Sequence, residues 1–163
     1  MNKVFLEIGG NQGNRLANIH KAIDLINKQI GNVIQQSSVY EAPPWGFESE
    51  QWFYNQVLVL ESELTSGQIL KGLLGIEKKL GRIRHQQKYC SRTMDIDILF
   101  FNNEVIDNPE LEVPHPRLHQ RLFVLQPLSE IAPNFVHPAL KKSISELLMI
   151  CEDKSECKRV EPF

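Results

Sequence analysis

The sequence is poor in cysteine and has no long hydrophobic run. Its three cysteines, Cys90, Cys151 and Cys157, show no CxxC spacing, so the pattern indicates neither a disulfide framework nor a zinc knuckle. No apolar stretch approaches the roughly 20 residues that cross a bilayer, and the first residues lack the features of a secretory signal. The sequence therefore predicts a cytoplasmic protein without a membrane partner.

An excess of positive charge is also missing. The formal net charge is −2, which argues against a nucleic-acid partner, because such a protein needs a basic surface. The length of 163 residues fits one ordinary domain with a single core. We expect residues 1–163 to form one monomeric domain whose end, residues 152–163, is a weakly ordered tail.

The hydrophobic spacing predicts strands at residues 4–8, 33–40, 56–61 and 94–101, and helices at residues 16–30, 65–80 and 143–151. Thr65 and Gln68 have the spacing of a capping box at the start of the second helix. This order is that of the α+β ferredoxin-like split βαβ sandwich, an antiparallel sheet with helices on one face. Two connections, residues 41–52 and 81–93, are too long for this plan, and loops of that kind are usually functional.

The sharpest local signal is the pair Asp95 and Asp97. Residues two apart on a strand share a face, so both carboxyl groups project together while Ile96 and Ile98 point to the core. Two adjacent carboxylates suit magnesium, which is held by one or two carboxylates plus substrate phosphates. Taken alone, the pattern is equally compatible with two solvated acids on an exposed strand.

Phosphate charge must be met by side chains, because the sequence has no P-loop and no GxGxxG motif. Arginine suits bidentate phosphate contacts. The candidate donors are Arg82, Arg84, Arg92, His115 and Arg121. His115 and His119 also have the spacing of a metal pair, but no HExxH motif or third ligand supports zinc.

A third element combines prolines with aromatic residues. Pre-proline sterics keep residues 42–45 extended, so their backbone groups can face a planar heterocycle. Phe53 offers a stacking surface, and the Asn55 amide can donate and accept at one ring edge. Core packing remains the alternative for Trp52 and Phe53.

These elements together resemble the 6-hydroxymethyl-7,8-dihydropterin pyrophosphokinase family of folate biosynthesis. The motifs that carry the resemblance are Val39-Tyr40-Glu41-Ala42-Pro43-Pro44-Trp45-Gly46, Phe53-Tyr54-Asn55, Gly81-Arg82-x-Arg84, Arg92-x-x-Asp95-Ile96-Asp97-Ile98-Leu99, Val113-Pro114-His115-Pro116-Arg117 and Arg121-x-Phe123. They follow one another in the family's order and spacing from about residue 4 to residue 133. The resemblance implies transfer of pyrophosphate from MgATP to the pterin hydroxymethyl group, with release of AMP.

The resemblance also implies roles for individual residues. Asp95 and Asp97 would bind two magnesium ions and, with Arg82 and Arg92, would be catalytic. The residues that would bind the dihydropterin are Ala42, Pro43, Pro44, Trp45, Phe53, Asn55 and Phe123. Those that would contact or enclose ATP are Glu77, Arg82, Arg84, Arg92, Ile98, His115 and Arg121. Residues 10–14, 43–52 and 82–92 would be the family's mobile loops.

The sequence departs from the family pattern at Tyr89-Cys90-Ser91, where Trp-Gly-Pro is usual. Three alternatives remain open from the residues alone. A non-catalytic binding module on the same fold would bind nucleotide or pterin without consuming ATP. An RNA-recognition domain would use the same kind of sandwich, although its RNP signature is missing. A two-metal phosphohydrolase would release free phosphate without needing the pterin.

Overall fold

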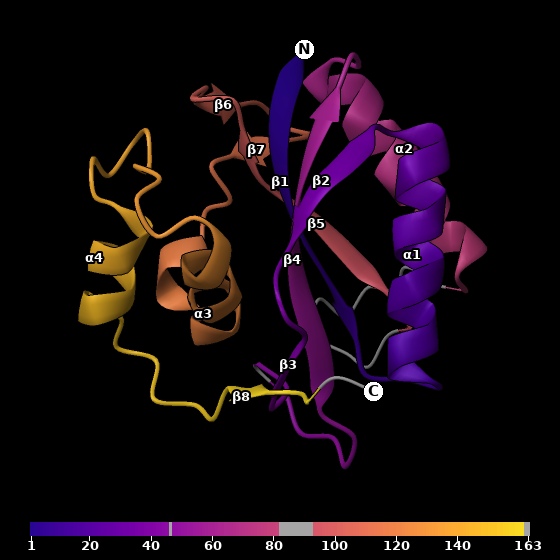
Figure 1. The fold of residues 1–163 in the computed structure, drawn as a ribbon, viewed down its shortest axis with the longest axis vertical. Coiled ribbons are helices and arrows are strands. Elements are labelled where there is room, and N and C mark those ends of the chain that lie inside the picture. The colour runs from indigo at the N-terminus through magenta and orange to yellow at the C-terminus, as the bar shows by residue number, and fades with distance from the viewer. Residues whose placement is uncertain (46, 82–92, 162–163) are drawn as a thin grey trace.

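The computed structural model describes residues 1–45, 47–81 and 93–161. Its main sheet has six strands in the order β5-β1-β4-β3-β8, with β2 also pairing with β4 (Figure 1). These strands are β1 (Asn2–Gly10), β2 (Asn32–Gln36), β3 (Tyr40–Ala42), β4 (Phe53–Ser62), β5 (Asp95–Phe101) and β8 (Lys158–Arg159). A separate two-stranded sheet joins β6 (Ile106–Asp107) to β7 (Glu112–Val113). The pairings are antiparallel, as the sequence predicted.

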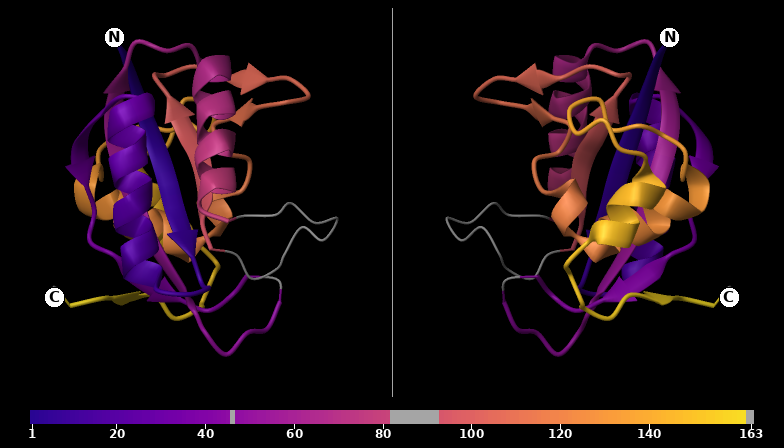
Figure 2. Two further views of the ribbon diagram at one scale, coloured as in Figure 1. Left: turned by 90° about the vertical axis from the view of Figure 1, so that its right-hand side faces the viewer. Right: turned by 90° about the vertical axis from the view of Figure 1, so that its left-hand side faces the viewer.

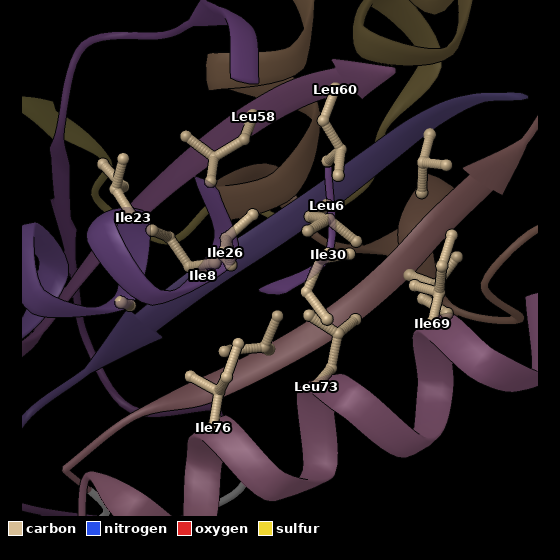
Figure 3. Close-up of a cluster of buried hydrophobic side chains, with 14 of the residues drawn as sticks. Leu6, Ile8, Ile23, Ile26, Ile30, Leu58, Leu60, Ile69, Leu73 and Ile76 are labelled. Atoms are coloured by element: carbon tan, nitrogen blue, oxygen red, sulfur yellow. The ribbon is translucent and has the colours of Figure 1, made fainter. Parts of the chain in front are cut away.

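Two long helices cover one face of the sheet (Figure 2). They are α1 (Arg15–Gln29) and α2 (Ser66–Lys79). Asn14 caps α1 with a side chain that accepts from the Ala17 N–H, and the predicted capping box of Thr65 and Gln68 is present at α2. Leu6 and Ile8 of β1 meet the apolar stripes of both helices in a dry core (Figure 3). Burial of this stripe is what stabilises each helix, because an isolated helix of this length is marginal in water.

The opposite face carries a second helical layer (Figure 1). It contains α3 (Leu122–Ile131) and α4 (Ile144–Ile150), preceded by a 3₁₀ turn at Leu118–Gln120. Phe5 and Phe100 of the sheet are buried in this second core. The predicted antiparallel sandwich is thus confirmed, and the single helical face expected from the sequence is extended by a layer that the proline-rich second half builds.

The strand expected at residues 33–40 is divided into β2 and β3. Ser37 lies in the gap and is 4% exposed. Its backbone N–H donates to the Val57 carbonyl at 2.9 Å, while its hydroxyl accepts from the Val57 N–H at 3.0 Å. The serine side chain therefore replaces a ladder bond at the break, which hydrophobic spacing does not reveal.

The end of the chain also differs from the weakly ordered tail that was expected. In β8, Lys158 pairs with Glu41 and Arg159 with Tyr40, and the Val160 N–H donates to the Val39 carbonyl at 2.8 Å. These pairings hold residues 158–160 at the sheet edge. Among the described helices, none has the length and apolar character needed to span a membrane.

Candidate active site

The carboxyl groups of Asp95 and Asp97 lie on the face of β5 that carries α3. Both residues are half-buried, whereas Ile96 and Ile98 between and beside them are buried in the α1 and α2 core. The alternation predicted from the sequence is therefore present. Among the residues that the structure describes, no three His, Cys, Asp or Glu side chains are arranged to hold a metal ion by themselves. The pair fits magnesium only if substrate oxygens complete the coordination shell, which is the usual arrangement for this ion.

A third carboxyl group on the same face was missed by the sequence analysis. Glu7 of β1 lies directly opposite Asp97 in the β1–β5 register, and it is only 4% exposed. An acid almost never stays buried without compensating partners. The signal was available in Phe5-Leu6-Glu7-Ile8, because period-two alternation places Glu7 on the same face as Phe5.

His115 is placed next to this acidic group. Its Nε2 is 4.0 Å from Oδ2 of Asp97, and its backbone N–H donates to the Leu99 carbonyl of β5 at 3.0 Å. Burial and the nearby Arg121 guanidinium lower the pKa of His115 to about 4, so its imidazole is neutral at neutral pH. Because Nδ1 accepts from the Arg117 N–H at 3.2 Å, the remaining proton lies on Nε2, facing Asp97.

Arg121 joins the acidic group to aromatic rings. Its guanidinium carbon lies 4.6 Å from the ring centroid of Trp45 and 5.6 Å from that of Phe123. Burial lowers the pKa of Arg121, although the carboxyl groups of Asp97 and Glu7 oppose that effect. The guanidinium remains a cation and is held by the ring faces and the nearby negative charge.

The residues predicted to read a pterin lie at the neighbouring ends of β1, β3 and β4. Asn55 is 3% exposed and pairs with Gly9 across the β1–β4 ladder. Phe53 makes an edge-to-face contact with Phe47, with ring centroids 6.0 Å apart. Ala42 is buried at the end of β3.

The loop after β3 is hollowed on one side. Pro43, Pro44, Phe47 and Trp52 are among the residues that line an open cavity of about 590 Å³ there. The lining comes from the loop alone and includes Glu48 and Glu50, and neither Asn55 nor Phe53 is part of it. Phe47 and Trp52 offer ring faces on which a planar heterocycle could stack.

Two residues expected near ATP are part of the framework that carries the acidic pair. Glu77 of α2 is 2% exposed, and its Oε2 accepts from the Ile96 N–H at 2.7 Å. Ile98 is buried in the first core. Glu77 therefore fixes the backbone between Asp95 and Asp97. Arg82, Arg84 and Arg92, which the sequence placed in the phosphate site, lie outside the described residues.

The sequence analysis also missed a clamp formed by Arg15. Its Nη1 donates to Oε2 of Glu41 at 2.7 Å and to the Trp52 carbonyl at 2.8 Å, while its guanidinium lies 3.8 Å from the Tyr54 ring centroid. Glu41 lies in β3 just before the loop of residues 43–52, and Trp52 is the last residue of that loop. Arg15 therefore ties both stems of that loop to the start of α1.

Comparison with known proteins agrees with this arrangement. A family model described as 7,8-dihydro-6-hydroxymethylpterin-pyrophosphokinase (HPPK) matches residues 5–133. A 2-amino-4-hydroxy-6-hydroxymethyldihydropteridine pyrophosphokinase of Porphyromonas gingivalis is 41% identical over 138 residues, which cover 83% of this chain and 93% of that protein. An Aquifex aeolicus protein of the same name is 39% identical over 146 residues, or 90% of each chain. The chain therefore belongs to the HPPK family.

Solved structures support the fold independently. A Plasmodium falciparum HPPK-DHPS chain matches 91% of this chain with a TM-score of 0.77 and 18% sequence identity. This chain spans 45% of that solved chain. The likeness confirms the layered α+β architecture, while the family assignment rests on the sequence matches.

Proposed function

We propose that this chain transfers pyrophosphate from MgATP to the hydroxymethyl group of 6-hydroxymethyl-7,8-dihydropterin in folate biosynthesis. Membership of the HPPK family carries the proposal. The acidic pair of Asp95 and Asp97 supports it by offering carboxylates for a metal-bound nucleotide, and the loop after β3 supports it by offering aromatic side chains for a flat ring.

Asp95 and Asp97 are the proposed ligands of magnesium, and we propose two ions at this pair. Bound magnesium would neutralise phosphate charge and bring the reacting groups together. The framework favours this role, because Glu77 holds the Ile96 N–H at 2.7 Å and thereby fixes the direction of both aspartates.

The proposed pterin site is formed by side chains around Asn55. Phe53 and Phe123 would stack on the ring, while Asn55 and the backbone of residues 42–45 would bond its polar edge. The burial of Asn55 supports this assignment, because a buried amide discriminates strongly between a ligand that satisfies it and one that does not.

On the nucleotide side, Arg121 and neutral His115 would contact phosphate and ribose or base groups. Glu77 and Ile98 would enclose ATP, and the resemblance adds Arg82, Arg84 and Arg92.

In the reaction, the pterin hydroxyl oxygen bonds to the β-phosphorus, and the bond between that phosphorus and the α,β-bridging oxygen breaks. AMP leaves with the electron pair, and the hydroxyl proton passes to Asp95 or to water. Most of the rate gain would come from positioning and charge neutralisation.

The decisive experiment incubates the protein with MgATP and 6-hydroxymethyl-7,8-dihydropterin and measures all products. We expect AMP and a pterin diphosphate in equal amounts. Free phosphate produced without the pterin would favour a phosphohydrolase, and binding without AMP would favour a non-catalytic module. Asp95→Ala and Asp97→Ala should abolish product formation, while Asp107→Ala, at an exposed acid of β6, should not change it.

We also propose that the enzyme is a monomer and acts in the cytoplasm. Light scattering after gel filtration tests the first statement, and fractionation of the source cells tests the second. A stable dimer that retained full activity would refute the monomer proposal without affecting the proposed reaction.

A further inference from the structure

The segment that follows α4 crosses from the second helical layer to the sheet edge. Near its start, Asp153 accepts two backbone hydrogen bonds. Its Oδ2 accepts from the Leu122 N–H at 3.0 Å, and its Oδ1 accepts from the Ser155 N–H at 2.9 Å. Burial raises the pKa of this carboxyl, but hydrogen bonds from the Ser155 side chain and from the Leu122 and Ser155 N–H groups outweigh burial, so the pKa of Asp153 lies below its ordinary value.

The amide that Asp153 holds is the first of helix α3. The residue before it, Arg121, is the N-cap of α3 and makes no capping bond with its own side chain. Helix starts leave N–H groups without intrahelical partners, and a carboxylate there is favoured both as an acceptor and as a negative charge. Asp153 therefore supplies from 31 residues away the cap that α3 lacks locally.

The capped amide connects two residues of the candidate site. Arg121 precedes Leu122 and Phe123 follows it, and the guanidinium of Arg121 lies over the Trp45 and Phe123 rings. A backbone shift at Leu122 would move both side chains, because neither is separated from it by another residue. The carboxyl of Asp153 holds the backbone at Leu122, and Asp153 does not line the recess formed by Pro43, Phe47 and Trp52.

The segment is fixed on its far side as well. β8 pairs with β3, and the Val160 N–H donates to the Val39 carbonyl at 2.8 Å. Asp153 is thus held between α4 and a paired strand, which limits its freedom to leave Leu122. It also lies outside residues 5–133, the part of the chain that the family model matches.

We propose that Asp153 is a positioning residue that sets the placement of Arg121 and Phe123 for substrate binding. The inference rests on the proposed function for its substrates and on the hydrogen bonds above for its geometry. It predicts that the terminal segment contributes to substrate affinity and not only to folding.

The test compares Asp153→Ala and Asp153→Asn with a control, Glu156→Ala, which removes an exposed acid of the same segment. Pterin and MgATP affinities are measured by calorimetric titration, together with kcat and KM, well below each variant's melting temperature. We expect Asp153→Ala to weaken pterin binding roughly two- to thirtyfold, the factor that corresponds to losing a helix cap. Asp153→Asn should recover part of this loss, since its amide oxygen still accepts one bond, and Glu156→Ala should match the wild type.

Two outcomes would overturn the inference. One is a lower melting temperature for Asp153→Ala with unchanged pterin affinity and KM, which would make Asp153 a structural cap only. The other is an equal loss of pterin affinity in Glu156→Ala, which would make the effect one of general charge. If the wild type itself neither bound the pterin nor released AMP, the proposed function would fail instead. Exchange protection of the Leu122 amide, measured by NMR without substrates, still tests the hydrogen bond in that case.

Discussion

Replacing Gly9 by alanine should damage pterin recognition from the strand next to Asn55. Gly9 of β1 pairs with Asn55 of β4. A Cβ atom at Gly9 would lie 2.3 Å from Oδ1 of Asn55 and 2.5 Å from the Tyr54 carbonyl oxygen. Both distances are shorter than non-bonded atoms tolerate, so the Asn55 side chain and the β4 backbone must move. The glycine is needed here for close approach between strands.

The free-energy cost of Gly9→Ala depends on which of the neighbouring atoms can move. The Asn55 carboxamide can rotate, but the Tyr54 carbonyl belongs to the backbone of a central strand, so part of the overlap becomes strain. Overpacking of this kind costs about 1–3 kcal/mol of folding free energy, out of the roughly 5–15 kcal/mol of a typical domain. Displacing the Asn55 amide should weaken pterin binding by a further 1–3 kcal/mol, or about 5- to 150-fold.

Urea unfolding gives the stability change, and calorimetric titration gives the pterin and MgATP affinities. The matched control is Gly75→Ala in α2, where a Cβ would meet no atom within 4 Å. It should raise the free energy of unfolding by about 0.5–1 kcal/mol, because alanine favours helix. In an Asn55→Ala background, Gly9→Ala should have little further effect on pterin affinity. Wild-type pterin binding by Gly9→Ala would refute the role of Asn55.

Further predictions concern the framework, the second core and the loop arginine. Glu77→Ala should lower the free energy of unfolding by about 1–3 kcal/mol in urea titrations, because it strands the buried Ile96 N–H, whereas Glu77→Gln should cost less. Burial and the bond to Glu130 raise the pKa of Tyr40 to about 12, so its contribution to stability is complete below pH 10 and is lost between pH 10 and 12. Tyr40→Phe should therefore flatten the alkaline decline in unfolding free energy, measured from pH 8 to 12. Arg92→Ala should lower the single-turnover rate by orders of magnitude while changing the directly measured MgATP affinity much less, as expected of an arginine used in the transition state.

The parts of the fold that the sequence predicted are those governed by local periodicity. The capping box at Thr65 lies within four residues, and the facing of Asp95 and Asp97 follows from the period of a strand. Both signals are contained in a short window, so no knowledge of neighbouring elements is needed to interpret them. The family motifs extended this to the expected site residues, and the homologues confirmed the family.

The features that the sequence did not predict depend on contacts between distant segments. Arg15 and Glu41 are 26 residues apart, and the Asp153 carboxyl caps a helix 31 residues earlier. In the sequence, each of these residues looks like an ordinary solvated charge. No neighbouring residue indicates that Arg15 forms a clamp or that Asp153 caps a distant helix. The split of the second strand has the same origin, because only the position of Val57 shows why Ser37 can end β2.

The charge balance of the described site indicates which form of nucleotide it can accept. Glu7, Asp95 and Asp97 carry three formal negative charges on one face, while Arg121 and the neighbouring Arg117 supply two positive charges and His115 is neutral at neutral pH. Bare triphosphate would be repelled by this part of the surface, so the nucleotide must bring compensating cations or meet the loop arginines. The Arg121 guanidinium cannot neutralise three carboxylates, because it carries a single positive charge. Magnesium ions that come with the nucleotide would reduce the repulsion, because a divalent cation is attracted to the carboxylate and phosphate oxygens alike.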